Sequence, residues 1–175
     1  MKKIILILVA SVSLWACPFD EAGVEVTILA HTEIYRAAKS GNFNKATKAI
    51  EKNKKLYRYF EQTGGGSIYQ PLLNASSAGN KGRIKAILDR TLALEVKELL
   101  GQVSGHFSNY QKSRLKLIKA KKHLKALTRN RTAMGYMKKI LKSLGNPGLM
   151  NVGKRPANKA MFSTNRSALL RHMGI

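Results

Sequence analysis

The sequence PLLNASSAGNKGRIKAILD, residues 71–89, contains two short helical segments separated by Gly79-Asn80. Residues 33–51, EIYRAAKSGNFNKATKAIE, have the same layout around Gly41-Asn42, at an offset of 38 residues. Glycine can end a helix by adopting a positive φ, and Asn42 or Asn44 can cap the helix that follows. A repeat of this period is typical of stacked helical units. The two segments therefore predict stacked helical hairpins in an all-α fold.

Both segments resemble ankyrin repeats. The resemblance rests on the start of the second copy, its small residues and the apolar spacing of its second helix: Pro71-Leu72, Ala75, Ser76, Gly79, Ile84, Ile87 and Leu88. Leu73 stands where the family usually has histidine, Glu33 replaces the proline of the first copy, and the period is longer than the usual 33 residues. Over residues 32–90 the resemblance implies a binding or scaffold protein that contacts a protein partner through its repeat groove. It implies no contact residues, because these vary among ankyrin proteins.

The first residues indicate export. Lys2 and Lys3 precede an apolar run from Ile4 to Ala16, which is typical of a secretory signal and shorter than the roughly 20 residues that span a bilayer. The run ends at Cys17, the only cysteine, and Leu14-Trp15-Ala16-Cys17 resembles a bacterial lipoprotein lipobox. The resemblance implies removal of residues 1–16 and lipid on Cys17. We therefore expect a membrane-anchored lipoprotein of the bacterial cell envelope, facing the periplasm or the exterior. The alternative is a buried thiol in a retained N-terminal helix.

The remaining chain divides by composition into a helical-hairpin repeat region at 17–100, a basic helical region at 101–146 and a basic, partly irregular tail at 147–175. The glycines at 64–66 are interpreted as a linker between hairpins, since no Lys-Ser or Lys-Thr follows as in a phosphate-binding loop. Gly101 to Gly105 predict a helix break. Helices are expected at about 110–127, capped by Asn109, at about 132–144, and in a short final segment ending at 172. In the first of these, Leu117, Ala120 and Leu124 form an apolar stripe, with Leu115, Ile118 and Leu127 placed near it.

Charge is distributed unevenly along the chain. All nine acidic residues lie before residue 99, together with 15 Lys and Arg, whereas residues 99–175 hold the other 17 Lys and Arg and no acid. A surface selected only for solubility would mix both signs, so we interpret the second half as anion-binding. The expected partners are an anionic membrane or a cell-envelope polymer. The candidate residues lie on the two basic helices and the joint between them: Lys112, Arg114, Lys116, Lys119, Lys121, Lys122, Lys125, Arg129, Arg131, Lys138, Lys139 and Lys142.

No pattern of catalytic or metal-ligating residues is present in the sequence. The four histidines lack metal-ligand spacing, and no serine lies in a nucleophile-elbow motif. We therefore expect no enzyme activity, no cofactor, no bound metal and no small-molecule substrate. A nucleic-acid-binding protein that retains its leader is the main alternative, and a membrane-active cationic protein is a third. Tyr57, Tyr59 and Phe60 could stack on bases, but packing between the hairpins is favoured.

Overall fold

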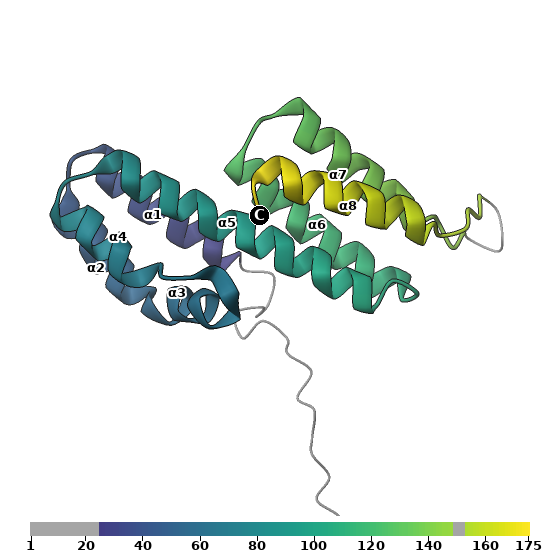
Figure 1. Cartoon of the computed structure of the whole chain (residues 1–175), viewed down its shortest axis with the longest axis horizontal. Helices are drawn as coiled ribbons and strands as arrows, with labels where there is room; N and C mark the ends of the chain where they lie inside the picture. The colour runs from purple at the N-terminus through teal and green to yellow at the C-terminus, as the bar shows by residue number, and fades with distance from the viewer. Residues whose placement is uncertain (1–24, 149–152) are drawn as a thin grey trace, which may run out of the picture.

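The computed structural model describes residues 25–148 and 153–175, and in these residues the fold is all-α (Figure 1). The leader and Cys17 lie outside the described residues. Within them, the only β-type pairing is an isolated bridge between Asn146 and Arg155, in the connection between the last two helices. The helices in chain order are α1 (Val26–Lys39), α2 (Phe43–Lys52), α3 (Lys54–Phe60), the π-helical turn η1 (Glu61–Gly65), α4 (Tyr69–Ser77), α5 (Lys81–Gly105), α6 (Tyr110–Leu127), α7 (Arg131–Ser143) and α8 (Lys159–Met173).

The two hairpin turns have the same backbone geometry, 38 residues apart. The glycine has a positive φ in both, 80° at Gly41 and 63° at Gly79. The asparagine that follows donates its N–H to the carbonyl five residues earlier, at 3.0 Å in the first turn and 2.9 Å in the second. Its side-chain oxygen then accepts the N–H three residues later, at 2.9 Å in both turns. Asn42 and Asn80 are therefore the helix caps, and the predicted helical hairpins are present.

The two hairpins stack so that the first helix of each lies beside the second helix of the other. α1 packs on α5, and α2 packs on α4. The small residues at the seam are buried: Ala46 and Ala49 on α2, and Ala75 and Ser76 on α4. The Ser76 hydroxyl, which is fully buried, lies 3.2 Å from the carbonyl oxygen of Phe43 and 2.9 Å from the Thr47 hydroxyl. A simple translation along a solenoid axis would place α1 beside α4, so this pairing resembles a four-helix bundle more closely than a linear stack.

The segment between the hairpins is a turn closed by a carboxylate. Glu61 accepts the backbone N–H groups of Ile68 and Tyr69 at 2.7 and 2.8 Å, and Arg58 lies 2.8 Å from its other oxygen. Burial raises the Glu61 pKa, but these hydrogen bonds and the arginine charge together hold the pKa below its ordinary value. The free N–H groups at the start of α4 are thus satisfied by Glu61 rather than by a phosphate. Tyr57 and Phe60 are buried in the core of the hairpins, as the packing interpretation predicts.

Helix α5 runs through the break expected at Gly101 to Gly105, so that expectation was wrong. Its 25 residues extend over about 37 Å, and the boundary at residue 100 falls inside the helix. Its first half, with Ile84 and Leu88, belongs to the core of the hairpins. Its second half, with Val96, Leu100 and Val103, packs with α6, α7 and α8 around a second core. α5 is thus shared by two helical bundles (Figure 1).

Candidate anion-binding surface

The long basic helix α6 is positioned by its cap and by one buried face. The Asn109 side chain accepts the N–H of Lys112 at 3.1 Å, so the predicted cap is confirmed. Leu117, Ala120 and Leu124 are fully buried in the second core, as the apolar stripe predicts. Ser113 is also on this face, where its hydroxyl donates to the carbonyl oxygen of His106 at 2.8 Å. These contacts fix which face of α6 points outward.

The outward face of α6 carries both basic and apolar side chains. Lys112, Arg114, Lys122 and Lys125 are exposed, while Lys116, Lys119 and Lys121 are partly covered. Leu115 and Ile118 were expected near the buried stripe. In the structure they are 61% and 37% exposed. At 100° per residue, Leu115 lies about 160° around the helix from Leu117, and Ile118 lies about 160° from Ala120. The outward face of α6 therefore presents apolar side chains as well as cations.

Lys122 pairs within the chain. Its ammonium lies 3.1 Å from Glu25, the residue that precedes α1, and the other Glu25 oxygen lies 3.7 Å from Nδ1 of His123. Nδ1 of His123 also lies 3.0 Å from the carbonyl oxygen of Lys119, so it carries the proton that this carbonyl accepts. Burial lowers the His123 pKa despite the hydrogen bond and Glu25, which act in the opposite direction. Lys122 is thus partly neutralised by a residue 97 positions away.

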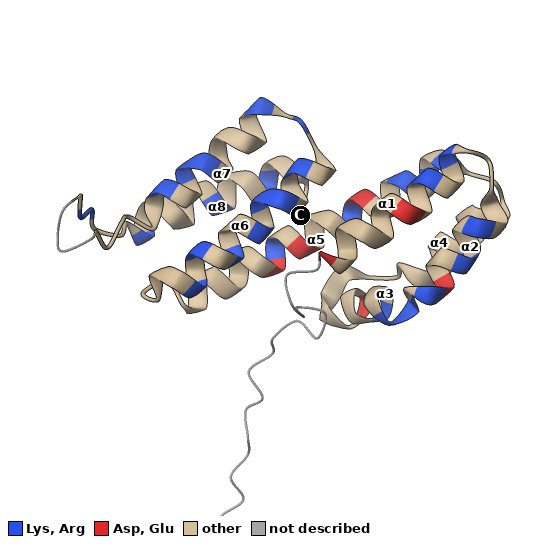
Figure 2. Cartoon of the chain, turned by 180° about the vertical axis from the view of Figure 1, so that it is seen from behind, with Lys and Arg blue, Asp and Glu red and all other residues tan. Residues whose placement is uncertain are grey.

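Helix α7 and the preceding joint supply a second set of exposed cations. Arg129 and Arg131 are exposed at the joint, where the Asn130 side chain caps α7. Lys138, Lys139 and Lys142 are exposed, while Met137 and Ile140 face the second core. Figure 2 shows Lys and Arg along α6 and α7, whereas α1, α2 and α5 also carry acidic residues. Of the twelve candidate residues, nine are classed as exposed: Lys112, Arg114, Lys122, Lys125, Arg129, Arg131, Lys138, Lys139 and Lys142.

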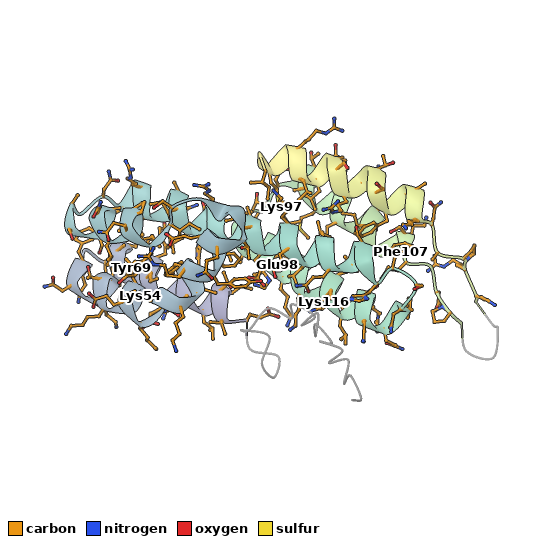
Figure 3. The ribbon with its side chains drawn as sticks, turned by 60° about the horizontal axis from the view of Figure 1, so that its bottom comes forward. Lys54, Tyr69, Lys97, Glu98, Phe107 and Lys116 are labelled. Atoms are coloured by element: carbon orange, nitrogen blue, oxygen red, sulfur yellow. The ribbon has the colours of Figure 1, made fainter. Side chains whose placement is uncertain are left out.

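Two carboxylates of α5 lie at the junction of the two bundles. Glu95 of α5 accepts a hydrogen bond from Thr27 at 3.1 Å, and Glu98 accepts from Tyr59 and Gln102. Burial raises the pKa of Glu95 to about 7, with further upward contributions from the Glu98 and Glu25 charges. Figure 3 labels Glu98 and Lys116 on α5 and α6, near the middle of the molecule. Sequence reasoning missed this polar junction, because its members are far apart in the chain.

Other parts of the described structure offer weaker sites. A cleft of about 490 Å³ lies between α5 and the end of α8, lined in part by Asp89, Arg90, Asn130 and His172. The Asp89 carboxylate lies 3.1 Å from Nε2 of His31 and also pairs with Lys85. Among residues 25–148 and 153–175, no group of His, Cys, Asp and Glu could hold a metal ion. In the same residues, no helix has the length and apolar character needed to cross a membrane.

Comparison with known proteins identifies no relative, since no protein family, curated protein or solved structure matches the chain. The fold and the surface therefore define only a class of protein: two helical bundles that share α5, with a basic face on the second bundle. The resemblance to ankyrin repeats stays a prediction.

Proposed function

We propose that this protein is an exported, lipid-anchored binding or scaffold protein whose basic second half contacts an anionic surface of the cell envelope. The observation that carries the proposal is the one-signed charge of residues 99–175, with 17 cations and no acid. Nine of the twelve candidate cations are exposed on α6, α7 and their joint. Such a surface attracts anions over several ångströms and is screened by salt.

The proposed location in the cell envelope is supported by the sequence alone. Lys2 and Lys3, the apolar run and Cys17 favour export and acylation, and these residues lie outside the described part of the structure. The hairpins formed by α1, α2, α4 and α5 would hold a protein partner in a groove, as the ankyrin resemblance implies. The basic bundle would then hold the protein against the envelope.

Fractionation of native cells, combined with lipid labelling, tests this location. We expect the protein in the membrane fraction, with an acylated Cys17 as its first residue by mass spectrometry. Finding an intact Met1 on a protein in the soluble cytosol would contradict the proposal. That result would favour the alternative, a nucleic-acid-binding protein.

A second measurement separates the two ligand classes. The purified native protein is titrated at about 0.15 M salt with duplex DNA and with vesicles of phosphatidylglycerol or of phosphatidylcholine. We expect binding to the anionic vesicles and only weak, steeply salt-dependent binding to DNA. Tight DNA binding with no preference between the two vesicles would favour the nucleic-acid alternative. Leakage of vesicle contents would instead favour a membrane-active protein.

A further inference from the structure

The exposed large hydrophobic residues of the described structure are Leu29, Leu115 and Ile118, with exposed fractions of 59%, 61% and 37%. Leu115 and Ile118 are three residues apart on α6, so they are neighbours on one helix face. They lie opposite the buried stripe of Leu117, Ala120 and Leu124, and the second core does not use them. Leu115 and Ile118 therefore lie outside both hydrophobic cores of the described protein.

The third exposed residue, Leu29, lies on α1. Leu29 lies one helical turn after Glu25, and Ile118 lies one turn before Lys122. Glu25 and Lys122 are joined by the 3.1 Å ion pair, which brings the start of α1 close to α6. Figure 2 shows α1 in the first bundle and α6 in the second. The exposed cations of α6 include Lys112, Arg114 and Lys125.

The acids near Leu29 are paired within the chain. Glu25 has only 15% of its side chain exposed and faces both Lys122 and His123. Glu33, one turn beyond Leu29, lies 3.8 Å from Lys52. α6 itself contains no acid. The charged neighbours of Leu115 and Ile118 on α6 are therefore all cations, while the two acids one turn from Leu29 are each paired with a lysine.

We propose that this face, Leu29, Leu115 and Ile118 with Lys112, Arg114 and Lys125, lies against an anionic phospholipid bilayer. The cations contact lipid phosphates and the apolar side chains enter the boundary between headgroups and acyl chains. A bilayer presents both chemistries in one plane, with anionic headgroups above hydrocarbon. A duplex nucleic acid or a soluble polyanion offers charge but no apolar layer for the three hydrophobic residues.

The proposed anchor places this face near the bilayer. This step rests on the proposed function, because it needs a lipid on Cys17. Cys17 is eight residues before Glu25, and a chain of that length spans at most about 30 Å. Glu25, the first described residue, pairs with Lys122 of α6, so the described part of the chain begins beside this helix. The anchor would hold the chain at the membrane, and the basic and apolar face would set how the second bundle lies against the bilayer.

A tryptophan probe tests the orientation separately from the anchor. The only tryptophan of the chain, Trp15, lies in the segment expected to be removed, so Leu115→Trp would be the only tryptophan in the mature lipoprotein. The matched control is Ser167→Trp, at an exposed position of α8, a helix that packs mainly against α7. Both acylated proteins are bound to phosphatidylglycerol vesicles that contain brominated lipids, and tryptophan emission is recorded.

We expect the Leu115→Trp emission to shift to the blue and to be quenched, while the Ser167→Trp emission changes little. Equal behaviour of the two probes on bound protein would overturn the orientation and leave the anchor intact. Loss of all vesicle association would instead contradict the proposed function. Quenching at residue 115 by an added protein or by duplex DNA, without quenching by vesicles, would assign the face to that partner and overturn the bilayer proposal.

A pair of charge variants completes the test. In the first, Lys112, Arg114 and Lys125 are changed to Gln in the Leu115→Trp background. In the second, Lys138, Lys139 and Lys142 of α7 are changed to Gln, which removes the same charge from another helix. The α6 triple variant should weaken lipid contact by residue 115 about hundredfold, and the α7 triple variant should change it much less. Equal weakening of this lipid contact by the two triple variants would show that the charge attraction is nonspecific. It would contradict the assignment of the bilayer contact to this face.

Discussion

Single asparagines set the starts of most helices of this protein. Asn42, Asn80, Asn109, Asn130 and Asn158 each accept a backbone N–H from the first turn of the helix that follows. This contact replaces a hydrogen bond that the first turn cannot make within the helix, which explains the preference for asparagine at these positions. The signal is local and can be recognised in the sequence, although the cap at Asn158 was missed and α8 has 15 residues where a short helix was expected.

Glu95 makes the stability of the protein depend on pH. Its pKa is raised to about 7, above the ordinary value of 4.5, so the folded state binds the proton more tightly than the unfolded state does. The contribution is fully present below pH 4.5 and is lost as pH rises to about 7, with a magnitude on the order of 2–3 kcal/mol. Glu95→Gln should therefore raise the free energy of unfolding at pH 8 and change it little at pH 4.5.

Urea denaturation at the two pH values measures this difference. His123 titrates in the opposite sense, since its lowered pKa favours the folded state at higher pH, but it is present in both proteins and cancels in the comparison. Glu51→Gln, at an exposed position of α2, serves as the control and should have little effect at either pH. The same change in stability from Glu95→Gln at pH 4.5 and pH 8 would contradict the assignment.

At the scale of elements, the seam between α2 and α4 depends on small residues. Ala75 is 2% exposed, so Ala75→Leu would force a larger side chain into a packed contact. Overpacking of this kind costs about 1–3 kcal/mol. We expect a lower melting temperature by calorimetry, while Ala86→Leu at an exposed position of α5 should leave it nearly unchanged. Similar melting temperatures for Ala75→Leu and the native protein would refute the packed seam.

In helix α5 we predict a substitution that stabilises the protein. Gly101 lies inside the helix, and an added Cβ would meet no atom within 4 Å. Gly101→Ala should therefore stabilise the protein by about 0.5–1 kcal/mol, through the better helix propensity of alanine. Gly79→Ala should destabilise it, because φ at this position is +63°. Destabilisation by Gly101→Ala in denaturant titrations would mean that the helix is interrupted there, as the sequence had suggested.

At the scale of the whole molecule, the uncompensated charge of the second bundle opposes folding. The seventeen cations of residues 99–175 repel one another without an acid in the same region. Raising the salt concentration from about 0.02 to 0.3 M shortens the screening length severalfold and should raise the melting temperature. The Lys138, Lys139 and Lys142 to Gln variant should show a smaller rise. A melting temperature that falls with salt would indicate that attractive pairs, such as Glu25 with Lys122, dominate instead.

The sequence by itself determined the all-α class, the two hairpin turns, the cap at Asn109 and the separation of charge. These features depend on contacts within one helical turn or on composition, so nearby residues suffice to predict them. The tertiary structure decided the rest: unlike helices pair between the hairpins, α5 continues through Gly101, Leu115 and Ile118 face outward, and Lys122 meets Glu25. Each of these depends on which distant helix covers a given face, and the periodicity of a single helix does not contain that information.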